Sequence, residues 1–434
     1  MILEYSIANT FSIKEKQTIS FEAVVSDGQT DACHCIPVNG KRILKLACLY
    51  GANASGKTKM AFALDFYLDF LVNSFSDLKP NETTHFVPFE FSEESRKLPG
   101  EFEIVFYTKD FSSDKIIRYE YLLKLTSKEV VEESLYYAPK GQKKLLFERI
   151  KDKSVKWGTD VTGTKKIVAD LARQNCSLIG AGAQANHPVF KHIYDHFSHR
   201  FRGIITPAYT GISGQLLRRI EKNAEFKNKV IKLLSASDMG KISDIKIESQ
   251  PIPDELIKQM PSEMQEEIEK HGEKPRTRKA KLIHAYDTEY ELPLSLESAG
   301  TLRMMQLAMP LDDLTVHQSF GIIDEIESSL HQELLEKFIQ LFLEDSENSQ
   351  LLFTTHNQDL LDSGLLRDDE VWFCYKTDKG NSVYNAITDY TGIRKEVSRK
   401  KLYQADKFGA LPNIDINTLR ELFNAKKNGK DTEQ

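Results

Sequence analysis

The hydrophobic pattern of the first part of the chain predicts strands, a glycine-containing loop and a long helix. Residues 2–8 and 17–24 partly alternate apolar and polar side chains, as half-buried strands do. Residues 43–50 form a short, β-rich apolar run that ends at Gly51. Residues 57–77 then follow the spacing of an amphipathic helix, so we expect the order strand, loop, helix.

The middle of the chain changes its period. Residues 101–148 contain several strand-like runs separated by turn-rich segments, which predicts an antiparallel meander. Residues 165–235 follow a helical period. Residues 250–283 are highly charged and poor in large apolar residues, so we expect an exposed helix with a flexible basic end there. The strand pattern resumes after this segment.

Two apolar segments in the last third of the chain end in titratable side chains. The segment QSFGIIDE ends in Asp324 and Glu325, and the later segment QLLFTTH ends in His356. Both segments have the length and apolar character of buried strands. The sequence therefore predicts two core strands that carry polar groups at their tips.

Composition places the chain among ordinary globular proteins. It has 434 residues, of which 40% are hydrophobic and 28% charged, enough for two to three domains or one large domain with insertions. The net charge of −6 argues against a protein coated in nucleic acid, although it allows a local basic groove. Five scattered cysteines predict no disulfide framework and a reducing, cytoplasmic setting. We expect no signal peptide and no membrane span, because no long uninterrupted apolar stretch occurs.

A phosphate-binding loop is predicted between the strand at 43–50 and the helix that follows. The segment GANASGKT fills the template G-x-x-x-x-G-K-[ST]. In such a loop the backbone N–H groups wrap the phosphates, and the helix N-terminus adds its positive dipole. The lysine reaches the β- and γ-phosphates, and the threonine hydroxyl binds Mg²⁺. The sequence therefore predicts a nucleotide and Mg²⁺ as ligands, with contacts from Gly51, Asn53, Ala54, Ser55, Gly56, Lys57 and Thr58.

The acidic pair at the end of QSFGIIDE supplies the second half of a nucleotide site. Asp324 can join Thr58 in the Mg²⁺ shell. Glu325 can orient or deprotonate the attacking water. His356, at the other strand tip, can donate a hydrogen bond to the γ-phosphate and sense hydrolysis. We therefore predict Glu325 and His356 as catalytic residues, and Thr58 and Asp324 as metal ligands.

A turn of small residues, Ser298-Ala299-Gly300, leads directly into a predicted helix. A helix N-terminus binds anions, although an ordinary N-cap explains this short pattern better when it is taken alone. The order of the motifs changes that balance. A phosphate loop, a long interval, ESAGT, an apolar strand ending in Asp-Glu and then a TTH strand resemble the layout of ABC-type ATPases. In that resemblance Ser298 and Gly300 match the ABC signature and contact ATP, SSLH resembles the D-loop, and His356 resembles the switch histidine.

A more specific resemblance extends over most of the chain. The segments FSIKEKQTISFEA, LYGANASGKT, SASDMGKISDI, ESAGT, IDEIESSLH, LLFTTHNQDLLD and FGALP resemble blocks of the ABC-like AAA-family ATPases found in bacterial abortive-infection and phage-defence operons. Members of that family are similar to the heads of SMC and Rad50 proteins without their coiled coils.

The resemblance implies a fold and a domain organisation. The fold is α/β: an ABC-type P-loop ATPase head with a mixed core sheet, an antiparallel β meander and a helical insertion. We expect an N-terminal ATPase lobe over 1–160, a mainly helical insertion over 161–285, a C-terminal ATPase lobe over 286–395 and a C-terminal tail over 396–434.

The resemblance also implies partners and a role. It predicts ATP hydrolysis with Mg²⁺, and a homodimer or higher homo-oligomer in which Ser298 and Gly300 of one copy meet ATP on the phosphate loop of another. It predicts a sensor or scaffold in anti-phage defence that controls a separately encoded effector from the same operon, a nuclease that could be of the TOPRIM type. A phage protein would be the trigger. The alternative is a DNA-binding repair ATPase of the RecF or Rad50 kind.

Several weaker patterns leave alternatives open. His192, His196 and His199 share one face of a predicted helix at a spacing that suits a metal, but most such histidines are solvated. Two basic segments, at 272–281 and 393–404, could meet nucleic-acid phosphates. They could equally be a solvated face or a contact for an acidic protein.

Overall fold

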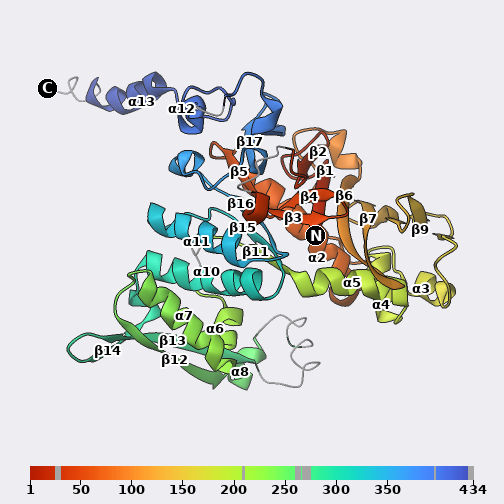
Figure 1. Cartoon of the computed structure of the whole chain (residues 1–434), viewed down its shortest axis with the longest axis horizontal. Helices are drawn as coiled ribbons and strands as arrows, with labels where there is room; N and C mark the ends of the chain where they lie inside the picture. The colour runs from red at the N-terminus through yellow and green to blue at the C-terminus, as the bar shows by residue number, and fades with distance from the viewer. Residues whose placement is uncertain (25–30, 208–210, 260–264, 266–274, 395–396, 429–434) are drawn as a thin grey trace.

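The computed structural model shows a layered α/β protein with a smaller α/β unit below it and a C-terminal helix that extends from the upper edge (Figure 1). It describes residues 1–24, 31–207, 211–259, 265, 275–394 and 397–428. Within these residues, no helix combines the length and apolar character that crossing a bilayer requires.

A six-stranded sheet forms the centre of the molecule. Its strand order is β11-β15-β16-β5-β17-β18, and every neighbouring pair is parallel except β17 and β18. The strands span β5 Leu46–Gly51, β11 Phe201–Ile205, β15 Phe320–Ile323, β16 Gln350–Thr354, β17 Val371–Lys376 and β18 Ser382–Ala386. The predicted strands before Gly51, Asp324 and His356 are therefore confirmed, and they lie side by side.

A seven-stranded antiparallel sheet lies against one face of this core. Its order is β10-β9-β8-β7-β6-β1-β2, which confirms the predicted meander. The strands span β1 Ile2–Ala8, β2 Gln17–Ser20, β6 Gly100–Asp110, β7 Ser113–Leu125, β8 Val130–Ala138, β9 Lys144–Ile150 and β10 Lys156–Trp157. A separate hairpin pairs β3 Cys35–Val38 with β4 Lys41–Leu44, after the short helix α1 Asp31–His34.

Both faces of the central sheet are covered, which explains why its strands are continuously apolar. Along β5, Ala47 and Leu49 belong to the core that contains helix α2 and the seven-stranded sheet. Their neighbours Cys48 and Tyr50 point to the opposite core, which contains helix α11. These two helices span α2 Lys57–Asp77 and α11 Gln332–Asp345.

The remaining helices form two groups. One group follows the meander and comprises α3 Lys165–Leu171, α4 Leu178–Gln184 and α5 Pro188–Arg200. The other group forms the smaller unit, in which α6 Gly214–Lys222, α7 Ala224–Ala236 and part of α10 Ala299–Val316 share a core with a three-stranded sheet. The chain ends with α12 Arg399–Gln404 and α13 Ile416–Asn428. Short 3₁₀ turns span η1 Ser95–Lys97, η2 Leu294–Leu296, η3 Asp359–Asp362, η4 Asp368–Glu370 and η5 Ile387–Asp389.

The helix expected over 250–283 is wrong for most of the described part of that segment. Its described helical residues are the single turn α8 Asp254–Ile257 and residue 265. The end of the segment belongs to a strand of the sheet β12 Ile242–Pro251, β13 Arg276–Ala285 and β14 Glu289–Pro293. Ala280 and Leu282 alternate into the core of the smaller unit. The charged neighbour Lys281 pairs with Glu248 of the adjacent strand at 2.9 Å. Apolar and charged side chains thus alternate every two residues along this strand, and the high overall charge obscured that alternation in the sequence. The rest of the predicted helix, at 260–264 and 266–274, lies outside the described residues.

Candidate functional site

The phosphate loop joins the end of β5 to the start of α2, as predicted. Gly51 ends the strand with φ 154°, and Gly56 precedes the helix with φ 118°. A Cβ atom at Gly51 would lie 2.2 Å from the carbonyl oxygen of Cys374 in β17. The loop therefore passes so close to the neighbouring strand that only glycine fits. Of the other loop residues, Asn53 and Ala54 are exposed, with Ala54 at φ 61°, whereas Ser55 is buried.

The hairpin β17–β18 supports the loop from behind. Ser382 Oγ donates to the carbonyl oxygen of Ser55 at 2.6 Å, and Tyr384 OH donates to that of Gly56 at 2.7 Å. Ser382 and Tyr384 share one face of β18 because they are two residues apart. Sequence reasoning missed both residues. The signal that could have found them is this pair of hydroxyl side chains on one face of a buried strand.

The Lys57 ammonium group folds back onto the loop that precedes it. Its Nζ donates to the carbonyl oxygens of Gly51 at 2.7 Å and Ala52 at 3.0 Å. Lys57 is buried, and desolvation lowers the pKa of its ammonium group. The charge that would meet a phosphate is thus held at the mouth of the loop by backbone dipoles.

Thr58 and Asp324 lie together although they are far apart in sequence. Thr58 Oγ1 donates to Asp324 Oδ1 at 2.9 Å. Thr354, at the end of β16, donates from Oγ1 to the same carboxylate oxygen at 2.6 Å. The arrangement places a hydroxyl and a carboxylate at the start of α2, beside the phosphate loop. Oxygen donors of this kind suit Mg²⁺, and the glycine cradle suits a phosphate, so the residues present fit a magnesium nucleotide.

Glu325 adopts an unusual backbone conformation directly after Asp324. Its φ is 45°, in the left-handed region that non-glycine residues seldom occupy. Its backbone N–H donates to Thr354 Oγ1 at 2.8 Å, which helps to hold this conformation. Desolvation, followed by the nearby charges of Asp324 and Glu327, raises the pKa of the Glu325 carboxyl group. A carboxylate with a raised pKa is a better proton acceptor.

Arg303 connects the predicted signature helix to this acidic pair, and sequence reasoning missed it. The side chain projects from α10 and is only 1% exposed. Its Nη2 donates to the carbonyl oxygens of Asp324 at 3.0 Å and Glu325 at 2.9 Å, and its Nη1 donates to that of Thr206 at 3.1 Å. Burial lowers the pKa of Arg303 to about 10, so the group stays charged at neutral pH. An arginine five residues after a serine N-cap was the available signal.

His356 lies beyond the tip of β16, close to the carboxylate of Glu327. The backbone N–H of His356 donates to Glu327 Oε1 at 2.5 Å. Desolvation lowers the pKa of the His356 imidazole, so the ring is neutral at physiological pH. The other carboxylate oxygen of Glu327 is buried and has no hydrogen-bond partner among the described residues. Glu327 is a further site residue that sequence reasoning missed, although it stands in the same IDEIE segment.

Ser298 and Gly300 lie at the N-terminus of α10, as predicted. Ser298 is the N-cap, and its Oγ accepts from the Thr301 N–H at 3.0 Å. A Cβ atom at Gly300 would lie 3.1 Å from the carbonyl oxygen of Ser329, so the turn packs against the D-loop-like segment. Among the described residues, no hydrogen bond joins Ser298 or Gly300 to the phosphate loop of the same chain.

The three helix histidines each have a separate partner. His196 stacks on Phe106 with ring centroids 5.5 Å apart, and burial lowers the pKa of its imidazole well below the usual range. His192 Nε2 lies 2.6 Å from the carbonyl oxygen of Lys109, and His199 Nδ1 lies 2.7 Å from that of Asp195. The structure therefore assigns these histidines to packing and backbone contacts around α5.

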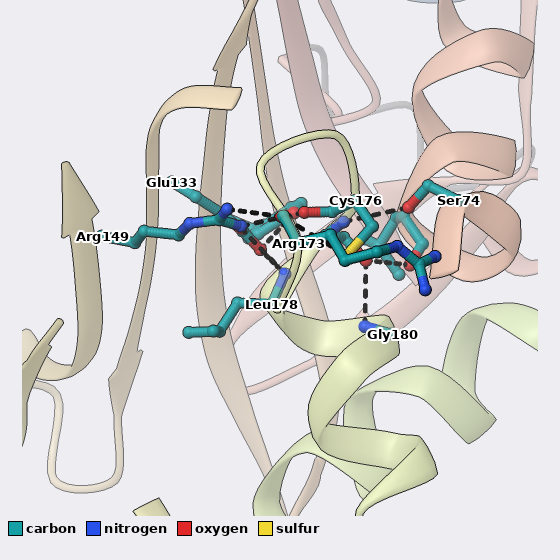
Figure 2. Close-up of polar contacts among 10 residues, drawn as sticks. Ser74, Glu133, Arg149, Arg173, Cys176, Leu178 and Gly180 are labelled. Carbon is teal, nitrogen blue, oxygen red and sulfur yellow. Dashed lines mark hydrogen bonds and ion pairs between the residues drawn. The ribbon is translucent and has the colours of Figure 1, made fainter. Parts of the chain in front are cut away.

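A buried polar network fixes the other end of α2 to the meander (Figure 2). Glu133 accepts from the Leu178 N–H at 2.9 Å and lies 3.5 Å from Arg149 Nη1. Arg173 donates to the carbonyl oxygens of Phe75 and Leu78, where α2 ends. The network anchors the helix that begins at the phosphate loop, so it stabilises the site from a distance.

Comparisons with known proteins identify a family for the chain. A family model described as "AAA domain, putative AbiEii toxin, Type IV TA system" matches residues 46–362. Among proteins with curated descriptions, none matches the sequence.

Three solved structures are similar to the chain at low sequence identity. The SMC head domain from Thermotoga maritima is 14% identical with a TM-score of 0.39, over 89% of this chain and 98% of its own. An SMC head bound to the C-terminal winged-helix domain of ScpA is 14% identical with a TM-score of 0.42, over 93% and 99%. An SMC head with an extended coiled coil, bound to the C-terminal domain of ScpA derived from Pyrococcus furiosus, is 12% identical with a TM-score of 0.37, over 94% and 99%.

Proposed function

Since this chain belongs to the AAA-domain family described as "AAA domain, putative AbiEii toxin, Type IV TA system", we propose that it binds and hydrolyses ATP and uses this cycle as a switch in anti-phage defence. The observation that carries the proposal is the contact of Thr58 Oγ1 with Asp324 Oδ1 at 2.9 Å, beside a glycine cradle and next to Glu325. Two segments that are distant in sequence thus lie together, which supports a shared role in nucleotide binding.

Each residue has a proposed role in the cycle. The loop residues Gly51, Asn53, Ala54, Ser55 and Gly56 would wrap the phosphates with their backbone N–H groups. Lys57 would leave its two carbonyl partners and contact the β- and γ-phosphates. Thr58 and Asp324 would hold Mg²⁺, which neutralises charge on the phosphates.

Hydrolysis would depend on Glu325 and His356. Glu325 would accept the proton of the attacking water, a role that its raised pKa supports. His356 would donate a hydrogen bond to the γ-phosphate from a neutral ring. Because Arg303 binds the carbonyl group of Glu325, it would act as a positioning residue for the base.

The active form would be a head-to-tail homodimer. Ser298 and Gly300 lie at the N-terminus of an 18-residue helix, which favours a negatively charged ligand. We propose that this helix end contacts the ATP bound to the phosphate loop of a second copy. ATP would then hold the two copies together, and hydrolysis would separate them.

Substitution of the proposed base tests the enzyme. Glu325→Gln should retain ATP binding, lose turnover by about a hundredfold or more and accumulate an ATP-bound dimer. Lys57→Ala should lose ATP binding. The assignment of Glu325 is wrong if Glu325→Gln hydrolyses ATP at the native rate in a steady-state phosphate-release assay.

We further propose that the switch holds or releases a separately encoded effector, a nuclease, in response to a phage protein. The family description, which names a toxin of a type IV toxin–antitoxin system, supports a defence role. Expression of the complete native operon, followed by affinity purification through this chain, should recover the effector. Recovery of this chain alone, with and without ATP, would contradict the proposal.

Direct DNA binding is the weaker alternative. Two of the basic side chains of β13 that could meet a phosphate backbone are already paired: Arg278 Nε with Glu221 at 2.7 Å and Lys281 with Glu248 at 2.9 Å. A repair ATPase should bind duplex DNA in an ATP-dependent manner, with affinity falling steeply as salt rises. Fluorescence anisotropy at two salt concentrations distinguishes the two functions.

A further inference from the structure

The C-terminal segment is firmly anchored up to residue 410. The Phe408 ring stacks on Phe373 of β17 with centroids 4.0 Å apart, and Tyr390 OH donates to the Phe408 carbonyl oxygen at 3.0 Å. Ala410 is buried, and Arg399 pairs with Asp368 at 2.7 Å. The FGALP segment therefore packs the tail against β17, the strand beside the phosphate loop.

Beyond the FGALP segment, the described side chains of helix α13 have no packing partner in their own chain. Every residue from 412 to 423 is exposed, and Figure 1 shows α13 extending from the upper edge of the molecule. Its apolar side chains recur at helical spacing on one face, with exposed fractions of 52% for Ile416, 42% for Leu419, 64% for Leu422 and 77% for Phe423. A helix of 13 residues is marginal in water without packing, so this face calls for a partner surface.

The hairpin that contains β14 offers a surface of matching character. Tyr286 and Tyr290 are 58% and 52% exposed, and Leu296 is 68% exposed. Residues 285–297 contain four acidic residues and no lysine or arginine. Glu291 pairs with Lys246 of β12 and Lys281 of β13. Asp287 and Glu289 therefore supply the negative charge of this surface. The α13 sequence instead contains three basic residues and one acidic residue. A helix with an apolar face and a net positive sequence thus has an apolar, aromatic counterpart that carries acidic side chains.

The tail of a chain does not cover the hairpin of the same chain, because α13 and β14 lie at opposite edges in Figure 1. The tail lies near the phosphate loop, and the hairpin lies near the signature turn. The tail leaves from β17, which pairs with the phosphate-loop strand β5. The β14 hairpin runs through η2 directly into the signature turn at Ser298. A pairing that brings a phosphate loop to a signature turn therefore brings a tail to a hairpin.

We propose that α13 of each copy docks on the β14 hairpin of the second copy, so that two reciprocal clasps close the dimer. Leu419, Leu422 and Phe423 pack on Tyr286, Tyr290 and Leu296, while Arg420 faces Asp287 and Glu289. This inference rests on the proposed head-to-tail dimer. It adds a contact outside the ATP site, since neither surface includes a residue of that site.

Cross-linking between two differently tagged chains tests the contact directly. One full-length chain carries Phe423→Cys and the other Tyr290→Cys, both in a Glu325→Gln, Cys33→Ser background. A short bis-maleimide should join the two tags in a single band, more strongly with ATP. Leu341→Cys on α11, whose side chain is also exposed, replaces Tyr290→Cys as the matched control and should give no such band. Equal cross-linking in the control pair, or none in the test pair, overturns the proposal.

A second measurement keeps the contact distinct from the ATP site. In light scattering, Leu422→Asp/Phe423→Asp in the Glu325→Gln chain should raise the concentration needed for ATP-dependent dimerisation by about tenfold or more, with ATP affinity unchanged. Unchanged dimerisation overturns the clasp but leaves the proposed function intact. If the Glu325→Gln chain without the two tail substitutions forms no ATP-dependent dimer, both the clasp and the proposed function are overturned. Loss of effector binding with dimerisation intact identifies the effector as the occupant and overturns the choice of a second copy.

Discussion

Arg303 shows how one side chain can link two parts of the proposed nucleotide site. Three backbone carbonyl oxygens, from Thr206, Asp324 and Glu325, receive hydrogen bonds from its guanidinium group. The group is rigid and planar, so movement of α10 is transmitted to the peptide that carries the proposed base. A lysine could not reproduce this geometry, because its single ammonium group cannot span the three acceptors.

Arg303→Met should therefore impair catalysis more than nucleotide binding. We expect kcat to fall by about tenfold or more while ATP affinity changes by less than about threefold. The unfolding free energy should fall by about 1–3 kcal/mol, because buried carbonyl groups lose their donors. Phosphate-release kinetics and chemical denaturation measure these quantities, and Lys337→Met, at an exposed position on α11, is the control. An equal loss of binding and kcat would contradict a positioning role.

The raised pKa of Glu325 predicts the acidic limit of activity. The base must be ionised, so kcat/KM should fall as pH drops through the pKa of this carboxyl group. Desolvation and neighbouring carboxylates raise that pKa, so the acidic limb of the pH–rate profile should lie above the ordinary pKa of 4.5. His356→Gln should lower the rate but leave the position of the limb unchanged. A limb that moves with His356→Gln would assign the titration to the imidazole instead.

At the scale of elements, the phosphate loop depends on the strands that flank it. The β17–β18 hairpin approaches so closely that a Cβ atom at Gly51 would meet the Cys374 carbonyl oxygen at 2.2 Å. That oxygen belongs to the backbone, so a side-chain rotation cannot relieve the clash. The loop conformation and the β5–β17 pairing are thus one structural unit.

Gly51→Ala should weaken the pairing of β5 with β17, because the added methyl group clashes with the Cys374 carbonyl oxygen. We expect a loss of roughly 2–5 kcal/mol in the unfolding free energy, from strain and overpacking together, and loss of ATP binding. Gly141→Ala is the matched control, because Gly141 also has a positive φ, 78°, but open space around it. Chemical denaturation of the control should show only about 1–2 kcal/mol of strain. Equal losses in both variants would show that the close approach is unimportant.

The same scale explains what sequence could and could not predict. The strand–loop–helix unit and the two strand tips follow from contiguous patterns, so Lys57, Asp324 and His356 could be predicted as site residues without knowledge of the fold. Arg303 and Ser382 donate to backbone atoms of distant segments, and the local patterns around them do not say which segments those are. In β13 a two-residue period was hidden, because cross-strand ion pairs allow a strand to carry many charges.

At the scale of the whole molecule, the half-sites lie in different parts of the chain. The phosphate loop, Thr58 and Asp324 form one half beside the central sheet. The signature turn packs instead on the D-loop-like segment at Ser329. A dimer with two-fold symmetry would form two equivalent sites, each with one half from either copy.

Mixing two inactive chains should then restore activity. Lys57→Ala lacks a functional phosphate loop, and Ser298→Arg blocks the signature turn. In an equimolar mixture, half of the dimers contain both chains, and each of these has one intact site, so about a quarter of the native ATPase rate should return. Mixing Lys57→Ala with Glu325→Gln is the control, since neither arrangement gives a site with both the lysine and the base. Absence of recovery in the first mixture would contradict shared sites.

The backbone of Glu325 has a consequence for how this protein can evolve. A non-glycine residue at φ 45° is strained by about 1–2 kcal/mol relative to an ordinary conformation. Asparagine tolerates this region better, so a chain that abandons hydrolysis can gain robustness by the same substitution that silences it. Selection for heat tolerance and selection for turnover therefore act in opposite directions at this position. An inactive descendant that only binds ATP should drift towards asparagine or glycine here. The identity of residue 325 therefore indicates whether a relative still hydrolyses ATP.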